Sequence, residues 1–130
     1  MDGDEVITDE IIRCAIEVHR CLGPGLLESV YESALCVELQ QQRLQFKRQV
    51  GIPLFYKGHL ISEHRPDLVV EDRAIVEIKS VSRLEPIHVA QVLTYLRVTR
   101  IQVGLLLNFN SAALRNGIRR VVLSSASVRE

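Results

Sequence analysis

The sequence lacks the features that mark several specialised classes of protein. It has no tryptophan, and no apolar run approaches the roughly 18 residues of a transmembrane helix. Its first five residues, Met-Asp-Gly-Asp-Glu, include three acids and lack the basic and then apolar layout of a signal peptide. It also has no internal repeat, no low-complexity segment, no glycine-rich phosphate loop and no helix-turn-helix pattern. We therefore expect a globular protein without a membrane partner.

Cysteine is scarce and odd in number. Cys14, Cys21 and Cys36 form no C-x-x-C pair, and each lies within a predicted helix. This arrangement predicts reduced thiols that pack as core, rather than a disulfide framework or a zinc site. Reduced thiols in turn indicate a cytoplasmic location.

Neither sign of charge dominates, because 16 basic and 16 acidic residues give a formal net charge of zero. The total therefore carries no global signature of nucleic-acid binding. The distribution is uneven: residues 1–42 hold nine acids and two bases, whereas residues 43–130 hold seven acids and fourteen bases. The clearest basic stretch contains Arg43, Lys47, Arg48 and Lys57. It can be a solvated sheet face or a track for phosphates.

The length of 130 residues suits one domain with a real core, and we expect a single domain over residues 1–130 with its core at about 8–123. Thr8 is the predicted cap of a first helix that Gly23-Pro24-Gly25 ends. A second helix is predicted over about 26–44. Its predicted apolar stripe consists of Leu27, Val30, Ala34 and Val37. We expect Glu32 on this helix to be solvated.

After residue 45 the pattern changes from helical to extended. Residues 46–56 alternate as a half-buried strand does, and Lys57-Gly58 signals a turn into a return strand that leads to Asp67. The other predicted elements are an antiparallel strand pair at 68–70 and 74–78, a helix that begins at Pro86, an apolar strand at 101–109 and a last strand at 118–123. The predicted order is two helices, three strands, one helix and two strands (ααβββαββ). This order predicts an α/β fold with a mixed sheet.

The strand near residue 77 carries charge where an apolar core residue is expected. Glu77 and Lys79 are two apart, so they share one strand face while Ile78 points to the other. Asp67 begins the preceding strand, and pairing can bring it close to Glu77. Two carboxylates suit a hard cation such as magnesium, and a lysine can orient a water or offset charge on a phosphate. The alternative is a salt bridge on a solvated face.

Two helices offer further candidates. Glu28 interrupts an apolar run directly after the Gly-Pro-Gly turn. On the third predicted helix, His88, Gln91 and Tyr95 follow one another at intervals of three and four residues, so they form a polar line on one face. A helix that directly follows the Glu-x-Lys strand can place this line beside the site. Each residue alone is also compatible with a plain surface role.

Several blocks of the sequence together resemble the GxxExxY protein family. Gly25-Leu26-Leu27-Glu28-Ser29-Val30-Tyr31 matches the pattern that names it, and the likeness extends over about residues 11–123. The other similar blocks are Tyr56-Lys57-Gly58-His59, Asp67-Leu68-Val69-Val70-Glu71, Val76-Glu77-Ile78-Lys79, Gln91-Val92-Leu93-Thr94-Tyr95 and Val103-Gly104-Leu105-Leu106-Leu107-Asn108-Phe109. That family is placed in the PD-(D/E)xK nuclease superfamily.

The resemblance implies a restriction-endonuclease-like fold, in which helices flank a mixed sheet. It implies that Asp67 and Glu77 bind Mg²⁺ or Mn²⁺ with the Ile78 carbonyl, and that Lys79 is the catalytic lysine. Glu28 would match an additional acid of the metal site, and Gln91 the polar residue on the following helix; Tyr95 is a further candidate.

Two functions of different kinds follow from these observations. The first is a metal-dependent nuclease that hydrolyses phosphodiesters of DNA or RNA, with nucleic acid as the partner. Its specificity would then come from the structure of the DNA or RNA, from a homodimer or from a protein partner. The second is a non-catalytic nucleic-acid-binding or accessory module that keeps the nuclease fold. The neutral net charge favours the module, and the intact Asp67, Glu77 and Lys79 set favours the enzyme.

Overall fold

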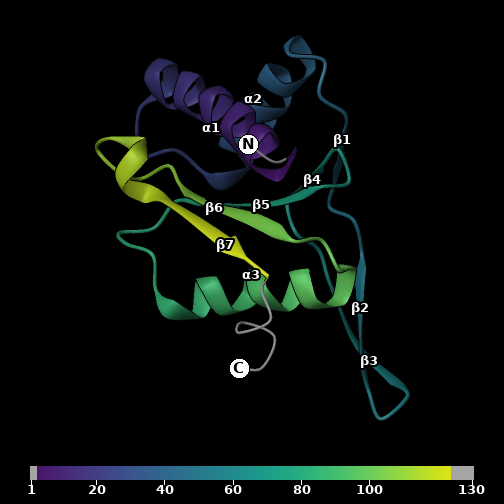
Figure 1. Cartoon of the computed structure of the whole chain (residues 1–130). Helices are drawn as coiled ribbons and strands as arrows, with labels where there is room; N and C mark the ends of the chain where they lie inside the picture. Colours follow the sequence, from purple (N-terminus) through teal and green to yellow (C-terminus); the bar gives the residue numbers. More distant parts are fainter. Residues whose placement is uncertain (1–2, 124–130) are drawn as a thin grey trace.

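A computed structural model describes residues 3–123 of the chain. A five-stranded mixed sheet lies between two layers of helix (Figure 1). The elements are α1 (Gly3–Leu22), α2 (Glu28–Gln41), β1 (Phe46–Arg48), β2 (Ile52–Tyr56), β3 (His59–His64), β4 (Leu68–Val70), β5 (Ala74–Lys79), α3 (Pro86–Thr99), β6 (Val103–Asn108), the 3-10 helix η1 (Leu114–Gly117) and β7 (Ile118–Val122). The α/β class and the restriction-endonuclease-like layout are confirmed.

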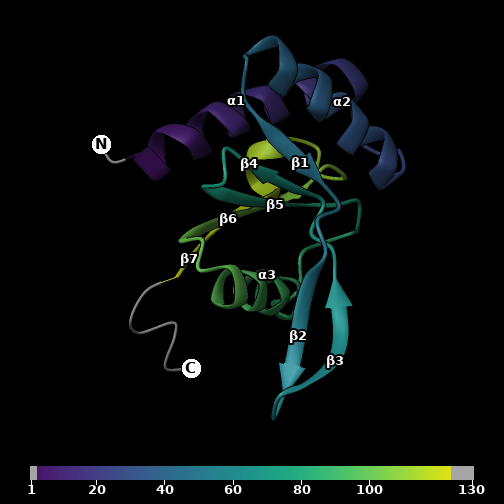
Figure 2. The same cartoon turned by 90° about the vertical axis from the view of Figure 1, so that its right-hand side faces the viewer.

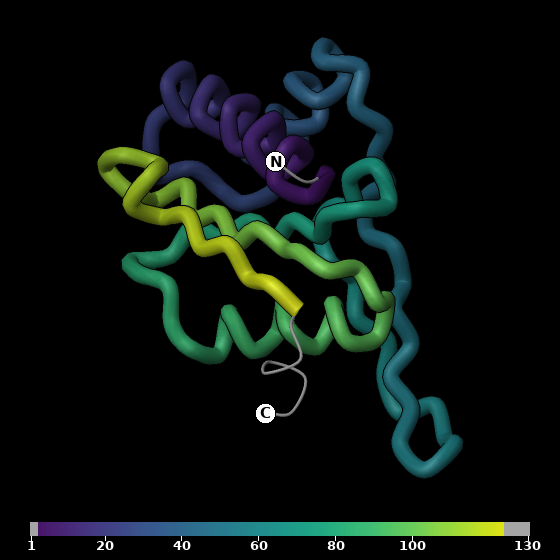
Figure 3. Tube along the Cα trace, in the orientation of Figure 1, coloured from purple at the N-terminus to yellow at the C-terminus, as the bar shows by residue number. Residues whose placement is uncertain are grey.

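The strand order of the main sheet is β1-β4-β5-β6-β7. The β5–β6 pair is parallel because α3 returns the chain across the sheet, and the other neighbouring pairs are antiparallel. Helices α1 and α2 cover one face and α3 covers the other (Figures 1 and 3). All six residues of β6 are buried, as the apolar run predicted for a strand covered on both sides.

The two long strands predicted for residues 46–56 and 59–70 are each interrupted. β1 and β4 belong to the main sheet, whereas β2 and β3 form a separate hairpin that extends past α3 (Figure 2). Both interruptions lie at the same level, since the Gln49 N–H donates to the Asp67 carbonyl over 3.1 Å. Gln49 has a φ of 52°, which ends β1 and turns the chain out of the sheet.

The prediction that Thr8 caps the first helix was wrong. Helix α1 already includes Gly3, and Thr8 is buried within it. The Thr8 hydroxyl donates to the carbonyls of Asp4 and Glu5, one turn back, instead of to a free N–H group at a helix start. The predicted end of the helix is confirmed, because Gly23 has a φ of 69° and its N–H donates to the His19 carbonyl.

The predicted apolar stripe of α2 was wrong at three of its four positions, since only Ala34 packs against the core. Leu27, Val30 and Val37 are exposed. The helix instead buries the neighbouring face, which consists of Tyr31, Glu32, Leu35, Cys36 and Leu39. Apolar residues on both faces make the hydrophobicity pattern nearly uniform around this helix, so periodicity could not identify the buried side. The observed rotation turns Glu32 inward.

Among residues 3–123, no helix combines the length and the apolar character needed to cross a lipid bilayer.

The sheet has a hydrophobic core on each side. One core includes residues of α1 and α2, and the other includes residues of α3. Ala74, Val76 and Ile78 point to the α1–α2 side, and Ile75 points to the α3 side. Glu77 and Lys79 alternate in step with Ile75, which directs them to the α3 side at the end of β5.

Candidate active site

Asp67 and Glu77 face each other across two antiparallel strands. Leu68 pairs with Val76, and the same register continues to Asp67 opposite Glu77. The Asp67 N–H donates to Glu77 Oε1 over 2.8 Å, and the Ile78 N–H donates to Asp67 Oδ2 over 2.7 Å. Each carboxylate is therefore held by the backbone of the opposite strand, which fixes both side chains without using a cation.

Both carboxylates lie in an environment that opposes their charge. Glu77 is only 6% exposed. Burial, followed by the negative charge of Asp67, raises the pKa of Glu77 to about 7. Burial is also the main reason that the pKa of Asp67 rises, to about 6. The backbone hydrogen bonds oppose these shifts without cancelling them, so a bound cation would stabilise both charged forms.

Among the described residues, Lys79 is the basic residue that forms an ion pair with Glu77. Its Nζ lies 3.8 Å from Glu77 Oε2, and its side chain is 18% exposed. At this distance Lys79 attracts Glu77 but does not form a short hydrogen bond with it. The ammonium therefore lies beside the carboxylates with donors left for another group.

Glu28 approaches the same place from the start of α2. Its Oε2 accepts a hydrogen bond from the Ser80 N–H over 3.3 Å, directly after the Lys79 strand end. Its charge is close enough to contribute to the raised pKa of Glu77. Tyr31 supports this approach, because its buried hydroxyl donates to the Gly23 carbonyl over 2.6 Å and ties down the turn before α2. The structure thus brings Glu28 together with the strand residues.

Helix α3 contributes Tyr95 more directly than Gln91. Tyr95 is 6% exposed, and burial, then the charges of Glu77 and Asp67, raise the pKa of its hydroxyl. Gln91 lies one turn earlier on the same helix and is exposed. Within residues 3–123, no hydrogen bond joins its side-chain amide to Asp67, Glu77 or Lys79. The structure therefore places Tyr95 beside the carboxylates, whereas Gln91 is exposed and stays a prediction.

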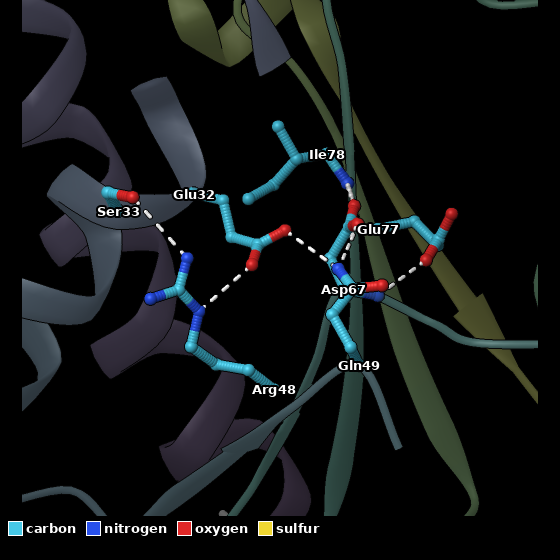
Figure 4. A network of polar contacts seen from close by, with 7 residues as sticks. All are labelled: Glu32, Ser33, Arg48, Gln49, Asp67, Glu77 and Ile78. Carbon is cyan, nitrogen blue, oxygen red and sulfur yellow. Dashed lines mark hydrogen bonds and ion pairs between the residues drawn. The ribbon is translucent and has the colours of Figure 1, made fainter. Parts of the chain in front are cut away.

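Glu32, which we expected to be solvated, is buried at 7% exposure. Arg48 Nε donates to its Oε2 and Gln49 Nε2 to its Oε1, each over 3.0 Å. The Gln49 amide also donates to Asp67 Oδ1 over 3.2 Å, so it joins the two carboxylates (Figure 4). No sequence pattern singled out Glu32 or Gln49, because their contacts depend on the break in the strand after Arg48.

The donor atoms gathered here suit a hard divalent cation. The described residues contain no group of three or more His, Cys, Asp or Glu side chains arranged as a ready-made metal site. Asp67 and Glu77 supply carboxylate oxygens, and the Ile78 backbone adjoins them through its N–H, which donates to Asp67 Oδ2. Two carboxylates completed by a carbonyl and water match the oxygen ligands that magnesium prefers.

The sheet with its flanking helices, and an aspartate opposite a Glu-x-Lys strand, define an α/β protein of restriction-endonuclease-like fold. A family model described as the PD-(D/E)XK nuclease superfamily matches residues 5–121, and the chain belongs to that superfamily. No curated protein and no solved structure matches the chain. The family indicates a nuclease-type function with nucleic-acid binding, and its nucleases are generally dependent on divalent metal.

Proposed function

We propose that the protein is a Mg²⁺- or Mn²⁺-dependent nuclease that hydrolyses phosphodiester bonds of DNA or RNA. The observation that carries this proposal is the buried Asp67–Glu77 pair with Lys79 beside it. The two buried carboxylates cost folding stability, because burial disfavours each negative charge. Their value, with that of Lys79 beside them, lies in binding an ion and a phosphate. The sequence blocks around Glu28 and Tyr31 further favour the GxxExxY branch of the superfamily.

Asp67, Glu77 and the Ile78 carbonyl are the proposed ligands of the metal, and Glu28 is the additional acid. When bound, the metal supplies a Lewis acid for the phosphate and a water of lowered pKa. Lys79 is proposed to donate a hydrogen bond to a phosphate oxygen and to offset its negative charge. Gln91 is proposed to contact the substrate from α3, and Tyr95 limits water access to the carboxylates.

A cleavage assay tests this function. The protein is incubated with single-stranded, duplex and branched DNA and with RNA, in the presence of Mg²⁺, Mn²⁺ or a chelator. We expect metal-dependent cleavage that Asp67→Ala and Lys79→Ala each lower by about 100-fold or more, as is typical when a charged catalytic group is lost. Arg20→Ala is the control, because Arg20 is an exposed base on α1 that pairs with Glu17.

Each alternative outcome has a definite meaning. Binding of nucleic acid without cleavage under either metal would support the accessory-module function instead. Cleavage at the parental rate by Lys79→Ala and Asp67→Ala would assign the activity to other residues or to a contaminant.

A further inference from the structure

A continuous line of polar contacts connects α2 to the proposed metal ligand Asp67 (Figure 4). It begins at Ser33, whose hydroxyl oxygen accepts a hydrogen bond from Arg48 over 3.3 Å. Arg48 holds one oxygen of Glu32, and Gln49 holds the other. Both Glu32 oxygens are therefore engaged, and Glu32 lies close enough to Asp67 to contribute to the raised pKa of that carboxyl.

Gln49 is fixed in a conformation that its residue type rarely adopts. Its φ of 52° lies in the left-handed region, which is uncommon for a residue with a side chain. Its N–H donates to the Asp67 carbonyl, and its side-chain amide donates to Asp67 Oδ1. Gln49 therefore forms hydrogen bonds with both the backbone carbonyl and the carboxylate of Asp67.

The opposite side of Asp67 is held as well. Its Oδ2 accepts a hydrogen bond from the Ile78 N–H, and its Oδ1 accepts one from Gln49. One donor on each oxygen defines the plane of the carboxylate and leaves the remaining lone pairs in fixed directions. Glu32 supplies a second acceptor for the Gln49 amide, so both of its N–H groups are used.

A purely structural role does not account for this arrangement. The Arg48–Glu32 ion pair alone would tie β1 to α2. Placing Gln49 between two carboxylates keeps two negative charges close together in a poorly solvated place, which opposes folding. Such a cost is typical of a functional site, where outer residues orient the groups that bind a ligand.

We propose that Gln49 and Glu32 are positioning residues for Asp67: the Gln49 amide orients the Asp67 carboxylate, and Glu32 orients the Gln49 amide. Neither residue contacts metal or substrate. The inference rests on the proposed nuclease function for its catalytic consequence. Its structural consequence, the direction of the Asp67 carboxylate, exists with or without catalysis.

The test compares Gln49→Met, which keeps the length of the side chain but removes the amide, with Glu32→Gln. Gln102→Met is the matched control, because Gln102 is an exposed glutamine whose side-chain amide donates to the Arg100 carbonyl. Mn²⁺ binding is measured by calorimetry, and kcat and KM are measured on the substrate found above. Loss of an outer partner typically lowers metal affinity or activity by about 10- to 100-fold. We expect Gln49→Met to reach that range with KM unchanged, and Glu32→Gln to show a smaller loss.

A third measurement separates this inference from the proposed function. In metal-free protein, the Ile78 amide proton reports the hydrogen bond to Asp67 Oδ2. We expect its NMR resonance to shift and its exchange to accelerate in Gln49→Met and Glu32→Gln, but not in Gln102→Met. Parental Mn²⁺ affinity, kcat and Ile78 resonance in both variants would overturn the inference. A parent that neither binds Mn²⁺ nor cleaves would refute the proposed function, while the Ile78 resonance would still decide the positioning role.

Discussion

The raised pKa of Glu77 predicts that the metal-free protein loses stability as pH rises. The pKa is about 7 in the folded protein, against an ordinary value of 4.5. Between these values the folded chain retains a proton that the unfolded chain has released, so unfolding becomes more favourable with rising pH. At about 1.36 kcal/mol for each pH unit, Glu77 alone removes on the order of 3 kcal/mol between pH 4.5 and 7. This is a large fraction of the roughly 5–15 kcal/mol typical of a folded domain.

Glu77→Gln isolates this contribution. Asp67 also loses its proton late, but its pKa of about 6 means that its effect is nearly complete below pH 7. Between pH 6 and 7.5 the parent should therefore continue to lose stability while Glu77→Gln remains nearly level. At pH 8 the variant should be more stable than the parent by about 3 kcal/mol. The glutamine carbonyl can still accept the hydrogen bond from the Asp67 N–H.

Urea unfolding followed by far-UV circular dichroism measures these values, since the chain has no tryptophan to report by fluorescence. A chelator keeps the protein free of metal. Glu63→Gln is the control, because Glu63 is half-exposed and pairs with Arg65 on the surface. Parallel curves for the parent and Glu77→Gln between pH 6 and 8, or a parent whose stability rises with pH, would refute the reasoning. Saturating Mg²⁺ should raise the stability of the parent at pH 8 and leave Glu77→Gln less affected.

Four substitutions test the packing around the site by the same unfolding measurement. Tyr31→Phe leaves the buried ring in place but removes the hydroxyl that anchors the turn before α2, so we expect a loss of about 1–2 kcal/mol; no loss would deny the anchor. Gly104→Ala places a methyl group 2.6 Å from Val92 Cγ1, and overpacking of β6 against α3 should cost about 1–3 kcal/mol. Leu35→Ala should cost about 2–5 kcal/mol and Val37→Ala less than about 0.5 kcal/mol; the reverse order would mean that α2 buries the other face.

The parts of the fold that could be predicted from sequence are those with strong local signals. The apolar run at 103–108 defined a strand covered on both faces, and Pro86 marked the start of α3. The charged residues of β5 were recognisable because Glu77 and Lys79 interrupt an apolar run at strand spacing. Asp67 could be expected opposite Glu77, since a short turn joins the two strands.

The inward position of Glu32 could not be predicted, because its cause lies in distant residues. Helix α2 carries apolar side chains on both faces, so hydrophobicity alone favoured the Leu27 and Val30 side. The acid is stable inside only because Arg48 and Gln49, which are far from it in sequence, donate to its two oxygens. The patterns in a single sequence do not show which distant side chains will donate hydrogen bonds to a given carboxylate.

The interruption of two strands was not predicted, for a different reason, and it explains how Gln49 comes to contact Asp67. Alternation continues through residues 46–56, although Gly51 and Pro66 weaken a ladder at both break points. Had both strands continued, their side chains and hydrogen bonds would have extended the sheet past Asp67. Instead β2 and β3 leave the sheet there as a hairpin, and Gln49 turns into the gap and bonds to Asp67. The same break that ends the ladder thus gives Asp67 its side-chain partner. Local backbone regularity is lost beside the proposed metal ligand Asp67, as is expected of a functional site.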